Sequence, residues 1–257
     1  MIIDFYKFQG TGNDFILIDD REELFDIDDS ILIMSLCERR FGIGADGLIL
    51  LRTHKTSTFE MIFFNSAGER STFCGNGGRC ILAFAHYLGL FKVECEFMAY
   101  DGIHEGSIDQ GIVSMKMADV EEVNVREDSV VLDTGSPHLV KIVENIKTVN
   151  VLKKGRKLRF SKEFGDYGIN VNFVDLLDGV SIRTYERGDE MESLSCGTGS
   201  VATAIALYEI GKSNDTNLKI KTSGGELTVA FDYDGTKYTD IWLSGEASMV
   251  YSGEFEC

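Results

Sequence analysis

Two cysteines stand in matching sequence contexts. The segment CGNGGRCILAFAHYLG spans 74–89, and CGTGSVATAIALYEIG spans 196–211. Each begins Cys-Gly-x-Gly and reaches a further glycine 15 residues later, and the second begins 122 residues after the first. A recurrence at about half the chain length indicates two similar halves.

A thiol at the start of a helix has a definite chemistry. The first N–H groups of the helix lack intrahelical acceptors and the helix dipole is positive there, so the thiolate is favoured and a pKa of about 3.5–7.5 becomes reachable. Glycines let a ligand approach the backbone, so the same N–H groups can bind a carboxylate. A lone cysteine of this kind is more often a buried core residue, but the repeat favours a functional pair, Cys74 and Cys196, facing one cleft.

Two opposed acid–base groups suit the inversion of a stereocentre. One group removes the proton from one face of a carbon, and the other returns a proton to the opposite face. The α-carbon of an amino acid is a very weak acid, so its carbanion needs stabilisation. Two helix N-termini aimed at the α-carboxylate would supply fixed dipoles where other enzymes use a cofactor.

The elements that must position these cysteines are of mixed α and β type. Helices are predicted after Cys74, after Cys196, and from the cap at residues 28–30 toward Gly42. Alternating and apolar segments predict strands at 14–19, 48–53, 60–65, 113–118, 180–186 and 226–231. The acidic stretch 119–128 separates two such patterns, so we expect a first domain over 1–118 and a second over 119–247.

Composition excludes several classes of partner. The formal charge of −17 disfavours nucleic acids and anionic membranes, and no apolar run reaches the length of a membrane span. The N-terminus lacks the apolar stretch of a signal peptide, and the six cysteines show no C-x-x-C spacing, so we expect a cytoplasmic protein with reduced thiols. Cys37 and Cys80 are expected in the core, and Cys95 and Cys257 are not assigned to the site.

The sequence resembles the diaminopimelate epimerase family along nearly its whole length. The matching segments, in order, are KFQGTGNDFILID (7–19), GIGADGLIL (42–50), FFNSAGERSTFCGNGGRC (63–80), GSPH (135–138), NVNFV (170–174), YERG (185–188), SCGTGS (195–200) and the terminal LSGEASMVYSGEF. The resemblance implies interconversion of LL- and meso-diaminopimelate without a metal or an organic cofactor, in lysine and peptidoglycan precursor biosynthesis. It also implies a homodimer.

The fold implied by the resemblance is α/β, of the α+β kind. It has two pseudo-symmetric domains, each an antiparallel sheet or barrel wrapped around a central helix, with residues 248–257 returning to the first domain and the active site in the cleft between domains.

The resemblance also assigns roles to residues. Cys74 and Cys196 match the catalytic cysteines, and His138 and Glu186 match a pair near the reacting centre. The residues implied in substrate binding are Asn13, Asn65, Gly75, Asn76, Ser136, Asn170, Glu186, Arg187, Gly197 and Thr198. Arg187 offers a planar fork to a distal carboxylate, and the asparagines can both donate and accept hydrogen bonds.

Two positions depart from the family pattern. Ser136 stands where many relatives have Asn, and Gly47 stands where some have Gln. A shorter side chain at 136 leaves two alternatives open: a bridging water to the distal group of the substrate, or a relaxed substrate preference.

Three other functions remain open at this point. A proline or hydroxyproline racemase shares the two-cysteine design, although the distal Asn and Arg set disfavours a small cyclic substrate. A thiol redox or metal-binding protein is disfavoured by the lack of a neighbouring His or Cys cluster. A non-catalytic amino-acid-binding protein would bind the ligand without exchanging its proton.

Overall fold

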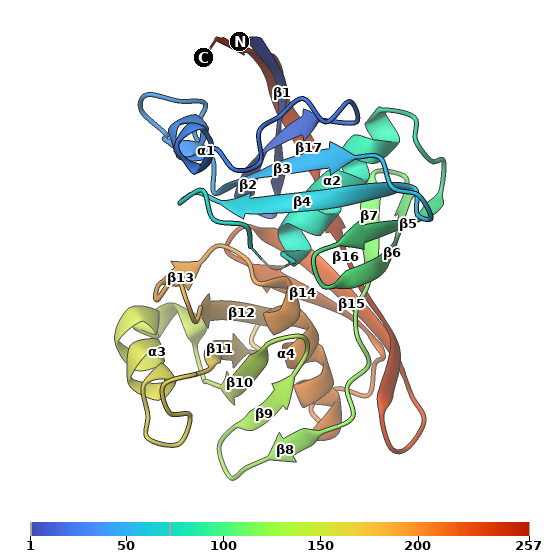
Figure 1. The fold of residues 1–257 in the computed structure, drawn as a ribbon. Coiled ribbons are helices and arrows are strands. Elements are labelled where there is room, and N and C mark those ends of the chain that lie inside the picture. Colours follow the sequence, from blue (N-terminus) through green and yellow to red (C-terminus); the bar gives the residue numbers. More distant parts are fainter. Residues whose placement is uncertain (1, 72, 257) are drawn as a thin grey trace. The chain divides into compact units, whose positions relative to one another are not determined.

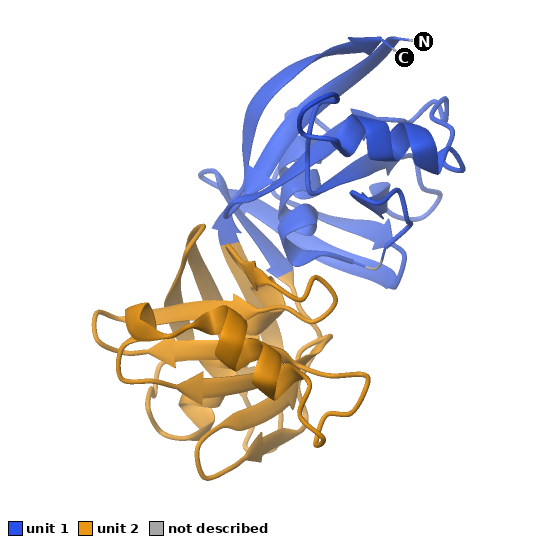
Figure 2. Ribbon diagram, turned by 90° about the vertical axis from the view of Figure 1, so that its left-hand side faces the viewer, with its two compact units in different colours: residues 1–115, 245–257 blue, residues 116–244 orange. Residues whose placement is uncertain are grey.

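The computed structural model describes residues 2–71 and 73–256, which form two compact units (Figure 2). Unit 1 comprises residues 1–115 and 245–257, and unit 2 comprises residues 116–244. Cys257 lies outside the described residues.

The sheet of unit 1 runs in the order β17–β1–β2–β3–β4–β5–β6–β7 (Figure 1). Its strands are β1 (Ile2–Gly10), β2 (Asn13–Asp19), β3 (Gly47–Arg52), β4 (Phe59–Asn65), β5 (Glu94–Ala99), β6 (Gly102–Asp109), β7 (Ile112–Lys116) and β17 (Ser248–Glu256). The β2–β3 and β4–β5 pairs are parallel, and the other pairs are antiparallel.

Each parallel pair of unit 1 is joined by a crossover that contains a helix, as parallel strands require. Helix α1 (Ser30–Cys37) lies between β2 and β3, and α2 (Gly75–Tyr87) lies between β4 and β5. Asp29 caps α1, because its side chain accepts a hydrogen bond from the Leu32 N–H at 2.9 Å. Helix α2 packs against β1, β2, β3 and β6.

The strands of unit 2 pair in the order β8–β9–β10–β11–β12–β14–β15, with parallel and antiparallel pairs, and β13 pairs with the end of β12. Its strands are β8 (Val123–Val125), β9 (Val130–Asp133), β10 (Pro137–Ile142), β11 (Asn170–Asp175), β12 (Val180–Tyr185), β13 (Glu192–Ser193), β14 (Asn217–Thr222), β15 (Gly225–Tyr233) and β16 (Tyr238–Glu246). The crossover from β10 to β11 carries η1 (Ile146–Thr148) and α3 (Val151–Arg159), and the crossover from β12 to β14 carries α4 (Gly197–Glu209).

The two units repeat one strand topology. Pairing in unit 1 from β1 to β6 is antiparallel, parallel, antiparallel, parallel, antiparallel. The same succession recurs in unit 2 from β9 to β15. The second crossover holds a 13-residue helix in both cases. Two repeated α/β domains are therefore confirmed, but their sheets are mixed rather than antiparallel, because each helical crossover returns the chain in its original direction.

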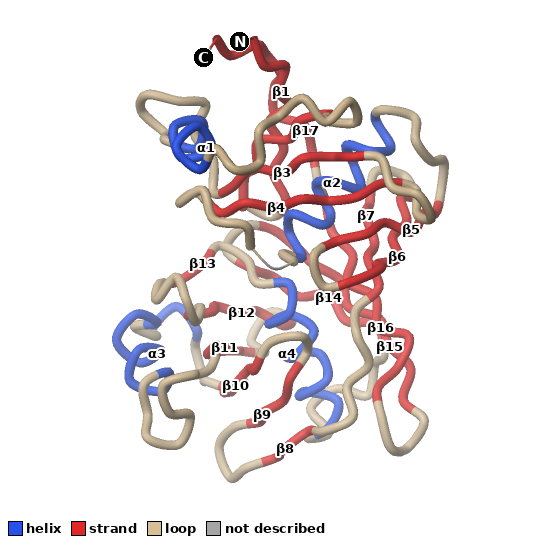
Figure 3. The backbone as a smooth tube through the Cα atoms, viewed as in Figure 1, coloured by secondary structure: helices blue, strands red, loops and turns tan. Residues whose placement is uncertain are grey.

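Helices α2 and α4 are the cores of their units. In α4, Val201, Ala204, Ile205 and Leu207 are fully buried, and the helix packs against β9, β10, β11, β14 and β15 (Figure 3). A helix that is apolar on every side needs this kind of enclosure. Among the described residues, no helix combines the length and apolarity needed to cross a bilayer.

Candidate active site

Cys74 and Cys196 occupy the same position in the two units. Each is the N-cap residue of its 13-residue helix, with φ/ψ of −118°/121° for Cys74 and −125°/113° for Cys196. Both residues are half-buried. The two Cys-Gly-x-Gly segments therefore adopt one local structure, with the thiol beside the first N–H groups of the helix.

In each unit the predicted site residues gather at one edge of the sheet. In unit 1, Asn13 begins β2 and Asn65 ends β4, and Asn65 lies opposite Gly47 at the start of β3. In unit 2, Asn170 begins β11 and is in register with His138 near the start of β10. Arg187 follows the end of β12. Because the topology repeats, corresponding strand ends surround the predicted site residues in each unit.

Four of the predicted residues in unit 2 form a continuous hydrogen-bonded cluster. The Thr198 hydroxyl lies 2.9 Å from Nε2 of His138, 3.3 Å from the Ser136 hydroxyl and 3.5 Å from Sγ of Cys196. Ser136 also lies 3.0 Å from Nε2 of His138. The first turn of α4 is thereby tied to the start of β10.

Asn172, which sequence reasoning did not single out, orients His138. This fully buried side chain donates from Nδ2 to Nδ1 of His138 at 3.0 Å, while its Oδ1 accepts from the Thr184 hydroxyl at 2.9 Å. Nδ1 of His138 is therefore the acceptor, and Nε2 carries the proton of the neutral ring. The signal in the sequence is a polar residue in the apolar strand NVNFVD, two positions after Asn170 and so on the same face.

His138 is uncharged in this arrangement. Burial and the charge of Arg187 lower its pKa to about 3. The ring consequently acts as a hydrogen-bond donor to the hydroxyls of Thr198 and Ser136, and its direct part in proton transfer stays a prediction.

The depressed pKa of His138 predicts a dependence of stability on pH. The unfolded chain binds a proton at His138 below about pH 6.5, whereas the folded protein does so only near pH 3. The contribution of this residue to stability is therefore complete above pH 6.5 and is lost as the pH falls toward 3. Denaturant titration of the parent should give a slope steeper by up to about 1.4 kcal/mol per pH unit than that of His138→Gln in this window. Equal slopes would contradict the assignment.

Cys196 and Glu186 influence each other directly. The thiol of Cys196 and the carboxylate of Glu186 share a hydrogen bond. Burial raises the pKa of Cys196, and the Glu186 charge raises it further, against hydrogen bonds from Thr198 and the Gly199 N–H. Burial also raises the pKa of Glu186. The lowered thiol pKa expected from the helix terminus is therefore wrong for Cys196 here, because desolvation and the neighbouring carboxylate outweigh the hydrogen bonds that favour the thiolate.

The second glycine of the motif makes room for the cysteine itself. A Cβ at Gly199 would lie 2.5 Å from Oδ1 of Asn172 and 3.3 Å from Sγ of Cys196. At the equivalent Gly77, a Cβ would meet mainly the flexible ends of Ile49 at 3.1 Å and Met61 at 3.4 Å.

We therefore expect Gly199→Ala to displace Cys196 and Asn172 and to lower kcat roughly 10²-fold, since a shift of about 1 Å at a reacting group has that effect. Gly77→Ala is the matched variant and should lower kcat less than about tenfold, because the ends of Ile49 and Met61 can move. Steady-state kinetics on both variants, with circular dichroism as a check on folding, measures the difference. Equal losses in the two variants would refute this explanation.

Asn170 is held in place by hydrogen bonds to two segments, Ser136–Pro137 and the chain at Arg187. Its Nδ2 donates to the Ser136 hydroxyl at 3.2 Å and to the Pro137 carbonyl at 3.1 Å, and its Oδ1 accepts from the Arg187 N–H at 2.8 Å. The guanidinium of Arg187 lies over the ring of Tyr167, 4.1 Å from its centroid. Asn170 thus joins the chain after β12 to the Ser136 segment.

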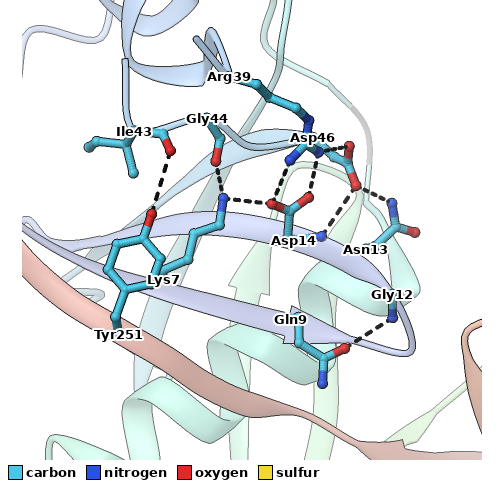
Figure 4. A network of polar contacts seen from close by, with 10 residues as sticks. All are labelled: Lys7, Gln9, Gly12, Asn13, Asp14, Arg39, Ile43, Gly44, Asp46 and Tyr251. Carbon is cyan, nitrogen blue, oxygen red and sulfur yellow. Dashed lines mark hydrogen bonds and ion pairs between the residues drawn. The ribbon is translucent and has the colours of Figure 1, made fainter. Parts of the chain in front are cut away.

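In unit 1, Asn76 on the first turn of α2 is bonded to Asn13. Nδ2 of Asn76 donates to Oδ1 of Asn13 at 2.6 Å. Nδ2 of Asn13 donates to Asp46 at 2.8 Å, as Figure 4 shows. Asp46 in turn accepts from Arg39 at 2.6 Å. The amide of Asn13 is therefore fixed in one orientation.

Asp14 anchors the other half of this network. It pairs with Lys7 and Arg39, each at 2.6 Å (Figure 4). Burial raises the pKa of Asp14, but hydrogen bonds from Arg39 and Lys7 outweigh it and lower the pKa to about 2. The start of β2 is thus secured by charged groups next to Asn13.

Asn65 and Gly47 are paired at the same edge of unit 1, where β4 ends and β3 begins. Oδ1 of Asn65 accepts from the N–H groups of Ala67 and Glu69, each at 3.0 Å, so the side chain shapes the turn after β4. A Cβ at Gly47 would lie 2.5 Å from the Phe64 carbonyl and 2.6 Å from the ring of Phe63. No side chain fits at position 47 unless the strand or the Phe63 ring shifts.

The other described cysteines differ from the pair at the helix starts. Cys37 and Cys80 are buried, as predicted. Burial raises the pKa of Cys37 to about 11 and also raises the pKa of Cys80. Both stay protonated near neutral pH, which suits core thiols.

Solved structures with the same fold have low sequence identity to the chain. A phenazine biosynthesis protein of the PhzF family from Bacillus anthracis is 14% identical with a TM-score of 0.80, and each chain is covered to 100%. A hydroxyproline epimerase from Agrobacterium vitis is 12% identical with a TM-score of 0.70, over 98% of this chain and 92% of the other. These similarities establish the fold alone.

Sequence comparison identifies the family. The profile described as "Diaminopimelate epimerase" matches residues 5–123 and 130–250. A diaminopimelate epimerase from Flavobacterium psychrophilum is 49% identical over 249 residues, covering 96% of this chain and 97% of the relative. One from Chlorobaculum tepidum is 39% identical, covering 95% and 98%. The chain, in which each of two repeated units starts a helix with Cys-Gly-x-Gly, is therefore a member of the diaminopimelate epimerase family.

Proposed function

We propose that this protein is a cofactor-independent isomerase that converts LL-diaminopimelate to meso-diaminopimelate through Cys74 and Cys196. The observation that carries the proposal is the repeat itself: each unit places a cysteine at the N-cap of its central helix, with nearly the same backbone angles. The family membership and the curated relatives named diaminopimelate epimerase support the choice of substrate.

In the proposed reaction one sulfur, as thiolate, takes the α-proton and becomes a thiol. The electron pair of the broken C–H bond passes into the α-carboxylate, which the N–H groups at the starts of α2 and α4 stabilise. The other sulfur, as thiol, gives its proton to the opposite face and becomes a thiolate. Atoms and charge balance, and the next turnover in the reverse direction begins from the exchanged protonation states.

Glu186 supports the proton chemistry of Cys196 in this scheme. Its carboxylate accepts a hydrogen bond from the thiol and raises the pKa of Cys196, which keeps this sulfur protonated and ready to donate. In the opposite direction Cys196 acts as the base, and Glu186 can hold the proton that the Cys196 thiol gives up before this sulfur takes the α-proton of the substrate. His138 donates to Thr198 and so holds the start of α4 that faces the reacting carboxylate.

The distal end of the substrate would be bound by Asn13, Asn65, Asn170 and Arg187. Ser136 supports this set in place of an Asn, because its hydroxyl bonds to Asn170 and His138. Fixing the far stereocentre away from the thiols leaves it untouched while the near one inverts. We further propose that the protein acts in the cytoplasm as a homodimer, as its family membership suggests.

Incubation with LL-diaminopimelate, followed by chiral chromatography, tests the function. The expected product is the meso isomer, approached from either side of the equilibrium without added pyridoxal phosphate or metal. Parallel incubations with L-proline and trans-4-hydroxy-L-proline test the rival racemase activity. Inversion of either ring amino acid at a rate comparable to that of diaminopimelate would overturn the assignment, and so would binding of diaminopimelate without inversion.

A further inference from the structure

A buried arginine lies under the start of α2. Arg79 is fully buried, five residues after Cys74 and on the same helix. Its Nη2 donates to the Thr11 hydroxyl at 2.9 Å and to Oδ1 of Asn76 at 2.8 Å, while Nη1 reaches the carbonyl of Gly75 at 3.5 Å. A Cβ at Gly10 would lie 3.1 Å from the Asn76 carbonyl and 3.3 Å from Sγ of Cys80, so the glycine lets β1 approach this part of α2 closely.

The acceptors around Arg79 are neutral. Among the described residues no carboxylate forms an ion pair with this guanidinium, and its Nε is buried without a hydrogen-bond partner. A guanidinium remains charged in proteins. An isolated buried charge is strongly unfavourable unless an opposite charge compensates it, so the arrangement calls for a nearby anion.

Two groups that can become anions interact electrostatically with Arg79, the thiols of Cys74 and Cys80. Cys80 is fully buried and its raised pKa keeps it protonated. Cys74 is half-buried and lies at the helix N-cap, where a thiolate is favoured. Cys74 is therefore the group whose ionised form can compensate the buried cation.

We propose that Arg79 is a positioning residue that serves as the built-in counter-ion of the Cys74 thiolate and fixes Asn76 against Asn13. The inference rests on the proposed function only for the use of that thiolate. Without the Cys74 thiolate, the charge of the Arg79 guanidinium would be uncompensated beneath the start of α2. When Cys74 is ionised, the two opposite charges stabilise each other, and Arg79 favours the thiolate that acts as the base.

Two further titratable groups, Asp14 and His104, lie on strands that pack against α2. Asp14 on β2 interacts with Cys80 but is already paired with Lys7 and Arg39. His104 on β6 stacks on the ring of Phe73, with centroids 4.0 Å apart, and bonds to Asp101.

The test is the pH dependence of alkylation of Cys74 by iodoacetamide, read by peptide mass spectrometry on the full-length protein without substrate. Arg79→Met, which removes the charge at similar length, should raise the apparent pKa of Cys74 by at least about one unit and slow alkylation at low pH roughly tenfold. Arg79→Lys keeps a charge and should restore most of the shift. Cys37, a buried thiol in the same unit, reports unfolding in the same samples, because unfolding would increase its alkylation.

The outcomes separate the two claims. An unchanged alkylation pKa of Cys74 in a folded Arg79→Met protein, or equal shifts in the Met and Lys variants, would overturn the counter-ion role. Because alkylation needs no substrate, an inactive parent protein with the expected shift would instead reject the proposed function alone.

Discussion

Replacement of Cys74 or of Cys196 by serine is expected to lower kcat for epimerisation of diaminopimelate roughly 10²–10⁴-fold, the usual effect of losing a general acid or base. A serine hydroxyl is a far weaker acid than a thiol, so neither proton abstraction nor the return step proceeds at the parent rate. Steady-state rates with LL-diaminopimelate measure the loss.

The matched control for the cysteine variants is Cys95→Ser. Cys95 is half-buried on β5, away in sequence from the two helix starts at Cys74 and Cys196. It should keep activity within about twofold of the parent, in line with a substitution away from the site. Single variants of Cys74 or Cys196 that retain near-parent activity would exclude the two-cysteine scheme.

Glu186→Gln is expected to show the second large effect, a loss of roughly 10²-fold in kcat. The amide keeps the size of the side chain but does not accept a proton. In the parent, the raised pKa of Glu186 means that the carboxylate is ionised only above its ordinary range. The parent should therefore lose activity as the pH falls through this pKa, and that acidic limb should be absent from the pH profile of Glu186→Gln.

Asp189→Asn is the control for this experiment. The Asp189 charge raises the pKa of Glu186 from a short distance along the chain. Its removal should leave kcat near the parent value and move the acidic limb slightly to lower pH. An acidic limb that persists unchanged in Glu186→Gln would show that another group controls it.

The sequence predicted the elements that carry strong local signals. The apolar strand at 14–19 is β2, and both helices expected after the two cysteines begin where the Cys-Gly-x-Gly motifs place them. The helix predicted to run toward Gly42 instead ends at Cys37. The chain reverses over the helix end there, with Gly44 donating to the Leu36 carbonyl. A Cβ at Gly42 would lie 1.9 Å from the Ser35 carbonyl.

Elements that depend on tertiary contact were not predictable. Helix α3 reads VLKKGRKLR, a basic segment interrupted by Gly155, which lowers helix propensity. In the folded unit that glycine lets α3 approach Tyr185, since a Cβ at 155 would lie 2.4 Å from the Cβ of Tyr185. This packing cannot be predicted from the sequence of α3 alone, because it depends on contact with β12.

The same limit applies to the site. Motif matching identified Cys196, Thr198 and His138, which the structure brings together. It did not identify Asn172 or Arg79, because their contribution lies in the atoms they orient and in a charge balance that only the folded unit reveals. Polar residues within otherwise apolar strands or helices are the sequence signal that points to such supporting roles, since a polar group that becomes buried must be hydrogen-bonded.

The central claim, that two sulfurs act on opposite faces of one carbon, is tested most directly by an isotope measurement in heavy water. During the initial phase of reaction with protiated LL-diaminopimelate, the meso product should carry deuterium at the inverted α-carbon, while the remaining LL substrate keeps its proton. A product that retains the original proton would mean that one group removes and returns it, and would contradict the account.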